Sequence, residues 1–479
     1  MKTTGIRHED KYAPERRTPL VPEDVRYLIS EHNIPFKVES SPKRVFSDQE
    51  YEAVGAEVTG GEVTRDEVAG VDAAGAEVAG GEVTRVDATG GEVTRKEVAG
   101  ADAAGDLSGC EIILGVKEMP VGYFRKGKVY VYFSHVIKGQ SQNMPMLRDL
   151  MDAGASLIDY ERILDNQGRR LIFFGRHAGI AGMINTLWTL GQRLKALGKA
   201  NPFERIGQAA TYDSLDQAKS DIRQAGEDLL ANGLPEGSEP LLFAVTGDGN
   251  VSQGALEIMD LLPVEKISAA RLARDNSRKL CVDPRKIYLV NLIPADYMVH
   301  REGREFDLAD YIAHPDAYES RFEHFLEPVD VLVNGIYWDE KYPRLVTKKW
   351  LKKRDALGTL RLSIIGDITC DPEGSVECTV KATGIEDPVF VYDPATGDHV
   401  MGFTGPGVTV MAVDILPSEL PRESSEHFSR LLTPWIPALA KADFQVPFER
   451  LQLPAELKRA LIVHNGHLTP DYAYLEQYL

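Results

Sequence analysis

The chain has few cysteines and no cysteine cluster. Its 479 residues include only Cys110, Cys281, Cys370 and Cys378, and none of these has the short spacing of a zinc site. We therefore expect no metal site and no disulfide framework. Free and mostly buried thiols are typical of a reducing compartment, which predicts a cytoplasmic protein.

The chain also lacks an excess of positive charge and any long apolar segment. Lys and Arg number 54 against 73 Asp and Glu, which gives a formal net charge of −19. Such a chain repels phosphates at long range, so neither nucleic acid nor an anionic membrane is an expected partner. No stretch approaches the roughly 18 apolar residues of a membrane span. The charged first 17 residues lack the apolar region of a signal peptide.

One segment, residues 55–104, has almost no large apolar side chains. It consists of ten pentapeptides with an acidic third residue, and it carries 11 acidic and 4 basic residues. A period of five matches neither a helix nor a strand, so its valines share no face. We expect a flexible low-complexity insertion. A short pentapeptide β-solenoid and an assembly element are the alternatives.

Outside this segment, apolar strands alternate with helices, which predicts an α/β protein with two parallel-sheet domains. Helices are expected at Val21–Ser30, Met146–Asp152 and His177–Leu197, and the last of these is expected to connect the two domains. Strands are expected at Pro35–Glu39, Ile112–Val116, Val129–Phe133, Ser156–Asp159, Leu171–Phe174, Leu242–Val245, Val264–Ile267, Ile287–Leu292, Asp330–Val333 and Leu362–Ile365.

Residues 242–255 place a glycine-rich turn between an apolar strand and a helix. Gly247 permits a tight turn, and Gly249 lets a pyrophosphate approach the amides at the helix start. Ser252 stands where a third glycine is usual, and Gly254 follows two residues later. The pattern favours a dinucleotide site over an ordinary glycine-rich turn. The candidate cofactor-binding residues here are Gly247, Gly249, Asn250, Val251, Ser252 and Gly254.

The segment after the next predicted strand bears on the choice of cofactor. No acidic residue ends Val264–Ile267, and Arg271 and Arg274 follow. Guanidinium groups at this place favour the 2′-phosphate of NADP over the free ribose of NAD. NADP is therefore the expected cofactor and NAD the alternative, because Asp275 is close and both arginines also fit a solvated helix face.

Eight short motifs occur in a fixed order along the chain. They are ERRTPLVP at 15–22, GVKEMP at 115–120, FSHVIKGQ at 133–140, DYE at 159–161, DNQGRR at 165–170, FGRHAGIAG at 174–182, NGIYW at 334–338 and GDITCD at 366–371. As a set they resemble the lysine-forming saccharopine dehydrogenases, and above all the lysine–ketoglutarate reductase part of aminoadipic semialdehyde synthases. The resemblance covers residues 1–54 and 106–479. A more distant similarity extends to alanine dehydrogenase and transhydrogenase.

The resemblance implies two Rossmann-like, doubly wound domains with an interdomain cleft. The expected division is a substrate domain at 1–175 containing the insertion, a NAD(P)-binding domain at 176–385, and a C-terminal segment at 386–479 that returns to the first domain. The implied reaction joins the ε-amine of lysine to 2-oxoglutarate and reduces the imine to saccharopine, or runs in reverse. These small molecules are the expected partners, and a homo-oligomer is compatible with the sequence. A second, saccharopine-oxidising half is expected to be absent.

Two residues follow neighbouring predicted strands and suit proton transfer. Lys117 comes just after Ile112–Val116, and His135 just after Val129–Phe133. Parallel strands would bring both side chains to one sheet edge, where ligands bind. Other cations nearby would lower the pKa of Lys117 into a useful range. In the resembling family the matching residues are the acid/base pair, so the resemblance implies that role for both.

Further candidates follow from the resemblance and from the charge of a dicarboxylate substrate. Arg17 and Arg169 offer bidentate guanidinium groups, whereas Glu118 and Glu161 match acids that hold the amine of lysine and tune Lys117. Asp367 and Asp371 follow a predicted strand and are expected near the nicotinamide, with turn formation as their alternative role.

Two other functions stay open at this point. One is a different amino-acid or opine dehydrogenase, because a few pocket side chains decide the substrate. The other is a non-catalytic nucleotide-binding subunit. The presence of both Lys117 and His135 argues against the second.

Overall fold

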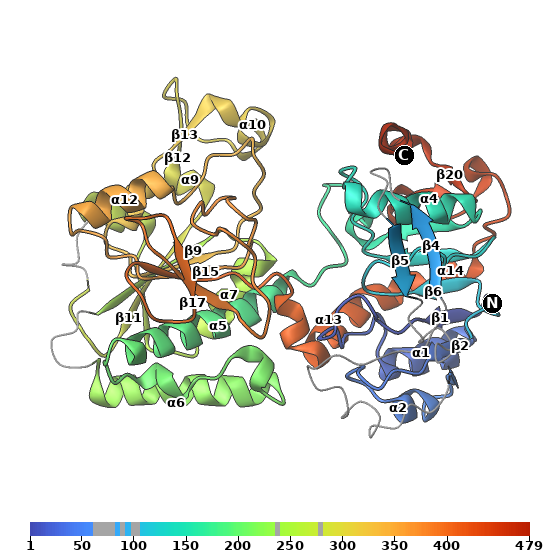
Figure 1. The fold of residues 1–479 in the computed structure, drawn as a ribbon, viewed down its shortest axis with the longest axis horizontal. Helices are drawn as coiled ribbons and strands as arrows, with labels where there is room; N and C mark the ends of the chain where they lie inside the picture. Colours follow the sequence, from blue (N-terminus) through green and yellow to red (C-terminus); the bar gives the residue numbers. More distant parts are fainter. Residues whose placement is uncertain (61–81, 87–91, 97–105, 235–239, 276–280) are drawn as a thin grey trace. The chain divides into compact units, whose positions relative to one another are not determined.

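The computed structural model describes residues 1–60, 82–86, 92–96, 106–234, 240–275 and 281–479. The chain forms two compact units, Met1–Phe173 with Ser424–Leu479, and Phe174–Glu423 (Figure 1). Among the described residues, no helix is both long enough and apolar enough to cross a bilayer.

The first unit is built on an eight-stranded sheet of order β20-β19-β8-β7-β6-β1-β2-β3. The strands from β8 to β3 are parallel, and β19 and β20 extend one edge in antiparallel fashion. The strands are β1 (Thr4–Ile6), β2 (Phe36–Glu39), β3 (Glu57–Thr59), β6 (Ile112–Leu114), β7 (Val129–Tyr132), β8 (Ser156–Asp159), β19 (Leu461–His464) and β20 (His467–Leu468).

The helices of this unit are α1 (Pro22–His32), α2 (Asp48–Glu52), α4 (Met144–Asp152), most of α13 (Pro421–Leu432), α14 (Ile436–Lys441) and α15 (Ala455–Arg459). Helices α1, α2 and α4 lie between parallel strands along the chain, and α13, α14 and α15 come from the C-terminal segment. Strands β6, β7 and β8 are buried along their whole length, as expected where helices cover a parallel sheet. Short 3₁₀ turns lie at Ser141–Asn143, Tyr160–Arg162, Thr433–Trp435, Phe448–Arg450 and Pro470–Tyr478.

The start of the predicted insertion is part of the sheet. Strand β3 lies in the first pentapeptide and pairs in parallel with β2, Val58 standing opposite Val38. The segment that interrupts the sheet therefore begins after residue 55, because residues 57–59 are themselves a strand of it. Further along, β4 (Glu82–Val86) and β5 (Glu92–Lys96) pair antiparallel in a separate two-stranded sheet. The rest of the predicted flexible insertion lies outside the described residues.

The second unit contains another eight-stranded sheet, of order β10-β11-β9-β14-β15-β18-β16-β17. Neighbouring strands from β10 to β18 pair in parallel, and β16 runs in the opposite direction and pairs antiparallel with both β18 and β17. The strands are β9 (Leu241–Thr246), β10 (Val264–Lys266), β11 (Ile287–Leu292), β14 (Val331–Asn334), β15 (Ile364–Asp367), β16 (Val389–Tyr392), β17 (His399–Met401) and β18 (Val408–Met411). A small antiparallel pair is formed by β12 (Met298–His300) and β13 (Tyr318–Ser320).

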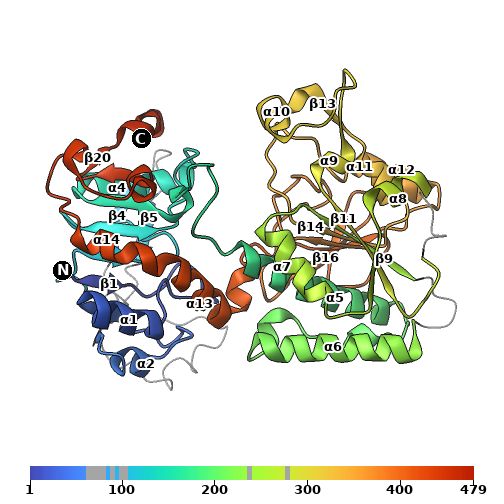
Figure 2. The same cartoon turned by 180° about the vertical axis from the view of Figure 1, so that it is seen from behind.

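Both faces of the second sheet are covered by helices. Along β9, Phe243 and Val245 belong to one apolar core and Leu242 and Ala244 to the other, because successive side chains of a strand point to opposite faces. Figure 2 shows α5 and α6 on one side and α8, α11 and α12 on the other. The helices are α5 (Gly175–Ala196), α6 (Leu215–Asn232), α7 (Asn250–Met259), α8 (Ala269–Asp275), α9 (Pro294–Tyr297), α10 (Leu308–Ala313), α11 (Phe322–Leu326) and α12 (Lys348–Ala356). Its 3₁₀ turns lie at Pro202–Arg205, Ala209–Thr211, Pro315–Ala317 and Leu416–Glu419.

These two parallel-dominated sheets confirm the predicted α/β class of two Rossmann-like units. Three details differ from the sequence-based expectation. Residues 171–174 form no strand and lead into α5, which belongs wholly to the second unit. The chain returns to the first unit at Ser424 and not at 386, because β16 to β18 complete the second sheet.

Helices α5 and α7 cross at very short range. A Cβ atom added to Gly179 would lie 1.8 Å from the carbonyl oxygen of Val251, and one added to Gly254 would lie 2.0 Å from that of Arg176. Neither glycine can carry a side chain while the backbones remain this close. Gly254, which the sequence placed among the cofactor-binding residues, therefore serves helix packing.

Candidate active site

The expected proton-transfer residues lie at one edge of the first sheet. Strands β6 and β7 pair in parallel with Leu114 opposite Val131, and β7 pairs with β8 with Tyr132 opposite Asp159. Lys117, His135 and Glu161 follow the carboxyl ends of these three neighbouring strands. For Lys117 and His135 this is the juxtaposition predicted from the sequence.

His135 forms a close pair with a carboxylate. Its Nδ1 lies 2.7 Å from Glu118 Oε1, and the other oxygen of Glu118 lies 2.7 Å from Lys11 Nζ. Burial would raise the pKa of Glu118, but the His135 contact and the Lys11 hydrogen bond lower it to about 2. Glu118 therefore stays ionised and orients the imidazole, with Nδ1 turned toward the carboxylate.

The backbone of His135 adopts the left-handed conformation, with φ of 48°. This conformation is uncommon for a residue with a side chain and must be held by its surroundings. The buried Asn143 donates from Nδ2 to the carbonyl oxygen of His135 over 3.0 Å. The preceding Ser134 donates its backbone N–H and its hydroxyl to the buried Asp159. Both neighbours fix the direction of the imidazole.

Lys117 lies among other charged side chains of the first unit. Burial lowers its pKa, and Arg17 and Lys11 lower it further, whereas Glu15 and Glu118 raise it. The net direction is downward, which increases the share of neutral amine near neutral pH. The Nζ atom lies 5.6 Å from the ring centre of Tyr12.

Arg17 is buried against Glu15. Its Nε donates to one oxygen of Glu15 over 2.7 Å, and an NH2 group donates to the other over 2.5 Å. Burial would raise the pKa of Glu15, but the charge and hydrogen bonds of Arg17 keep it below its usual value. The pair places one guanidinium and one carboxylate beside Lys117.

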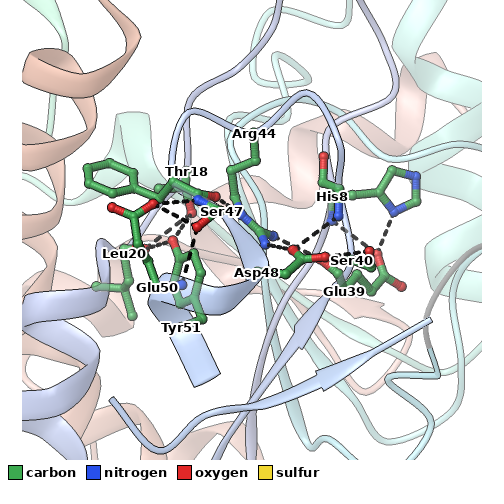
Figure 3. A network of polar contacts seen from close by, with 12 residues as sticks. His8, Thr18, Leu20, Glu39, Ser40, Arg44, Ser47, Asp48, Glu50 and Tyr51 are labelled. Carbon is green, nitrogen blue, oxygen red and sulfur yellow. Dashed lines mark hydrogen bonds and ion pairs between the residues drawn. The ribbon is translucent and has the colours of Figure 1, made fainter. Parts of the chain in front are cut away.

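The loop that carries Lys11, Tyr12, Glu15 and Arg17 is fixed at both ends. At one end His8 donates its backbone N–H to Glu39 over 3.0 Å, and at the other Thr18 contacts the hydroxyl of Tyr51. Figure 3 shows both ends within a network that includes Arg44 and Asp48. Sequence reasoning missed Glu9, Lys11, Tyr12 and Glu15, because the three-residue strand β1 before the loop is too short to recognise by pattern.

Arg169 and Glu161 have other partners than expected. Arg169 donates from Nε to Asp165 over 2.7 Å within its own turn, and its side chain is 74% exposed. The structure thus does not bring Arg169 to the Lys117 cluster. Glu161 pairs with Arg170 at 3.1 Å, so this arginine and not Arg169 lies beside the end of β8.

The glycine-rich turn lies at the carboxyl end of β9. Gly247 has a φ of 87°, which only glycine adopts readily, and Asn291 donates to the carbonyl oxygens of Val245 and Gly247 over 3.0 and 2.8 Å. Helix α7 begins directly afterwards. A Cβ atom on Gly249 would meet no protein atom within 4 Å. The open space beside Gly249 and the helix amides fits a bound pyrophosphate.

The other residues of this motif support the turn from inside. Ser252 is buried and donates to the carbonyl oxygen of Thr246 over 2.7 Å, which ties α7 to β9. Thr246 in turn contacts Asn334 at the end of β14. Asn250 is exposed at the helix start, and the partly buried Val251 lies against α5.

Asp367 is a structural centre rather than an exposed group. It is buried and accepts hydrogen bonds from Asn334, Thr379 and the backbone of Cys370 over 2.8, 2.6 and 3.2 Å. Burial raises its pKa to about 6 against these hydrogen bonds. Asp371 forms the turn 371–374, with its carbonyl oxygen bonded to Gly374. The expected direct role of both near a nicotinamide receives no geometric support.

The strand order contradicts the reason for choosing Arg271. In the sheet, the neighbour of β9 is β11, and β10 lies one strand further out. The ribose of a dinucleotide on the β9 turn would meet the end of β11. Arg271 is exposed on α8, after the outer strand β10. The end of β11 instead leads to Asp296, whose carboxylate accepts from Ile293 over 2.9 Å.

The described residues contain no group of three or more His, Cys, Asp or Glu side chains arranged to hold a metal ion. All four cysteines are free, three of them buried and Cys370 partly so. The first unit offers two groups suited to proton transfer, an amine of lowered pKa at Lys117 and the imidazole–carboxylate pair of His135 and Glu118.

Comparison with known proteins agrees with the two-unit fold. The family model described as Alanine dehydrogenase/PNT, N-terminal domain, matches residues 5–79 and 96–181, and the corresponding C-terminal domain model matches residues 290–471. The solved structure of an L-alanine dehydrogenase superposes with a TM-score of 0.57 at 17% identity and covers 99% of both chains. This likeness shows the fold.

Two kinds of relative match nearly the whole chain. An alpha-aminoadipic semialdehyde synthase of Arabidopsis thaliana is 38% identical over 98% of this chain, which spans 41% of that protein. A saccharopine dehydrogenase [NAD(+), L-lysine-forming] of Neurospora crassa is 26% identical over 90% of this chain and 89% of its own length. The chain thus spans less than half the length of the synthase relatives.

Proposed function

The chain belongs to the alanine dehydrogenase/PNT family, and within this family we propose that it forms or cleaves saccharopine, using a nicotinamide cofactor. The observation that supports the proposal most directly is the arrangement of Lys117 and the His135–Glu118 pair at adjacent strand ends. Lys117 has a lowered pKa and His135 is oriented by Glu118, so two groups that can carry protons follow adjacent strand ends. Condensation of an amine with a keto acid requires this combination.

The proposed chemistry needs a base and an acid in succession. The amine must lose a proton to attack the keto carbon, and the resulting hydroxyl must gain a proton to leave as water. Lys117 in its neutral form accepts the first proton, and His135 in its protonated form donates the second. Glu118 stabilises that protonated imidazole through the 2.7 Å contact. A bound nicotinamide supplies the hydride that reduces the imine.

Substrate carboxylates are proposed to bind to the cations around Lys117. Arg17 and Lys11 both act on the pKa of Lys117 and are therefore close to it. Lys11 is anchored by Glu118, and Arg17 by Glu15. Arg170, paired with Glu161 at the neighbouring strand end, is a further candidate. Arg169 has no place in this proposal.

The choice between NAD and NADP is proposed to be made after β11. Between Asn291 and Val299 the chain has no Lys or Arg, and Asp296 carries the only charge. A carboxylate favours a free ribose 2′-hydroxyl over a 2′-phosphate. This favours NAD and replaces the expectation of NADP that rested on Arg271.

Replacing Asp296 with Asn is expected to raise kcat/KM with NADPH relative to NADH, because it removes a negative charge from the 2′ position. Arg271→Ala is the matched variant and is expected to leave that ratio unchanged. Steady-state kinetics with both nucleotides measure the two ratios. If Arg271→Ala lowers the NADPH-to-NADH ratio and Asp296→Asn does not change it, the assignment to β11 is wrong.

The pH dependence should respond in opposite directions to the two neighbours of Lys117. Activity falls at low pH as Lys117 becomes protonated, so the acidic limb of kcat/KM follows its pKa. Arg17 lowers this pKa and Glu15 raises it. Arg17→Gln should therefore move the acidic limb to higher pH, and Glu15→Gln to lower pH. Shifts in the same direction for both variants would contradict a base at Lys117.

A steady-state assay with a panel of substrates tests the proposed function. NADH and NADPH oxidation is measured with 2-oxoglutarate plus lysine, with pyruvate plus ammonia, and with 2-oxoglutarate plus other amines. The proposal predicts a rate that requires both lysine and 2-oxoglutarate. Turnover only with another amine would favour a different amino-acid dehydrogenase. Nucleotide binding without turnover on any pair would favour a nucleotide-binding subunit.

A further inference from the structure

Glu9 is a fully enclosed carboxylate beside the candidate base. It lies in the loop after β1, and only 4% of the residue is exposed. Its two oxygens accept the backbone N–H groups of two consecutive residues at the end of β6. Oε1 accepts from Val116 over 2.6 Å and Oε2 accepts from Lys117 over 3.0 Å.

These two amides lie just after the end of β6, in the segment that carries Lys117. Just before it, the backbone N–H of Gly115 donates to the carbonyl oxygen of Val131 in β7, and Phe133, which follows β7 directly, donates its N–H to the carbonyl oxygen of Val116. Among the backbone–backbone hydrogen bonds of the described residues, none is donated by the N–H groups of Val116 and Lys117. Glu9 thus takes over from the strand pairing and sets the course of the chain at Lys117.

The surroundings are built closely around the carboxylate. A Cβ atom on Gly115 would lie 2.9 Å from the terminal methyl group of Met119 and in ordinary van der Waals contact with Glu9 Oε1 at 3.5 Å, so Gly115 and Met119 lie next to the carboxylate. Burial and the nearby Glu15 raise the pKa of Glu9 to about 7, against the two amides and Arg7, which lower it. Burying a carboxylate costs free energy. The two hydrogen bonds from the backbone of Val116 and Lys117 show that this carboxylate holds the segment after β6.

We propose that Glu9 is a positioning residue that holds the Val116–Lys117 peptide segment and thereby fixes the position of the Lys117 amine. The inference rests on the proposed function only in the role it gives to Lys117. The holding contact itself is a property of the loop after β1 and of the end of β6.

The test compares Glu9→Gln with Asp149→Asn. An amide side chain accepts through one oxygen only, so Glu9→Gln loses one of the two bonds and sets an NH2 group against the remaining N–H. Asp149 also accepts a backbone N–H in the same unit, from Gly122 over 2.6 Å, but has no contact with the Lys117 segment among the described bonds. Asp149→Asn therefore controls for the loss of a carboxylate–amide bond as such.

Two measurements are made on protein shown to be folded by circular dichroism and thermal unfolding. The first is steady-state kinetics, in which misplacement of a reacting group predicts a fall in kcat of up to about 100-fold with KM nearly unchanged. The second is the rate at which trinitrobenzenesulfonate labels Lys117, followed by mass spectrometry as a function of pH. We expect Glu9→Gln to change the labelling rate at least threefold, and we expect Asp149→Asn to leave the kinetics and the labelling rate unchanged.

The labelling measurement separates this inference from the proposed function. If the wild-type protein forms no saccharopine, the proposed function fails, and Lys117 labelling still decides the role of Glu9. If Lys117 is labelled in Glu9→Gln at the same rate as in the wild-type protein, and kcat is also the same, the inference is overturned. If Glu9→Gln does not fold, Glu9→Asp, which keeps the charge but withdraws it by one methylene, is judged by the same two measurements.

Discussion

Replacing Lys117 with Met should lower kcat about 10²–10⁴-fold, the range in which a positioned base contributes. Met keeps the length and the apolar contacts of the side chain but cannot accept a proton. The structure places the Lys117 amine beside Arg17, with its pKa lowered by burial. The loss should appear in kcat and kcat/KM alike, because the proton transfer belongs to the transition state.

The matched control is Lys126→Met, which removes an exposed lysine from the same unit. It should leave kcat unchanged, and both variants should bind nicotinamide nucleotide with wild-type affinity in a fluorescence titration. Wild-type turnover in Lys117→Met would contradict the assignment of the base. A loss of nucleotide binding with the turnover would point to misfolding instead.

Replacing Gly254 with Ala should destabilise the protein strongly, by about 3 kcal/mol or more, at the upper end of the cost of overpacking. The added Cβ atom would stand 2.0 Å from the carbonyl oxygen of Arg176, which belongs to backbone and cannot turn away. Helices α5 and α7 would have to separate. Chemical unfolding monitored by circular dichroism measures the change in the free energy of unfolding.

Gly249→Ala separates packing from ligand binding within the same motif. The added Cβ atom meets no protein atom within 4 Å, so the free energy of unfolding should change by no more than about 0.5 kcal/mol, as for other open surface positions. Nucleotide binding should weaken, because the methyl group occupies the space proposed for the pyrophosphate. Equal stability losses in Gly249→Ala and Gly254→Ala would contradict the close crossing of α5 and α7.

Features that depend on local pattern were predictable from the sequence. Buried strands such as Val129–Tyr132 and Ser156–Asp159 are recognised by continuous apolar runs, and the residues that follow them then share a sheet edge. This was enough to bring Lys117 and His135 together. The turn at Gly247 was recognisable for the same reason, because a strand, glycines and a helix are adjacent in the chain.

Features that depend on which elements become neighbours in space were not predictable. Strand β10 follows β9 in the chain, but β11 takes the place beside β9 in the sheet. For this reason the segment proposed to face the ribose is the one with Asp296 and not the one with Arg271. The function of Gly254 depends on the approach of α5, from a distant part of the chain. Arg169 pairs with Asp165, which lies four residues earlier in the chain. This local ion pair takes the place of the substrate contact that the sequence predicted.

The acids of the first unit were the least visible in the sequence. Glu9 and Glu15 lie in a charged loop that reads as exposed surface, yet both are buried. Their burial is explained by partners that only the fold supplies: two amides from the end of β6 for Glu9 and a bidentate guanidinium for Glu15.

The most direct measurement of the central claim follows the nitrogen of the substrate. The protein is incubated with lysine labelled with ¹⁵N at the ε-amine, 2-oxoglutarate and reduced nucleotide, and the product is analysed by mass spectrometry. The proposed function predicts saccharopine that retains the label, one molecule for each nucleotide oxidised, and no product with Lys117→Met. Nucleotide oxidation that yields an amino acid without the label, or no coupling of the two substrates, would contradict it.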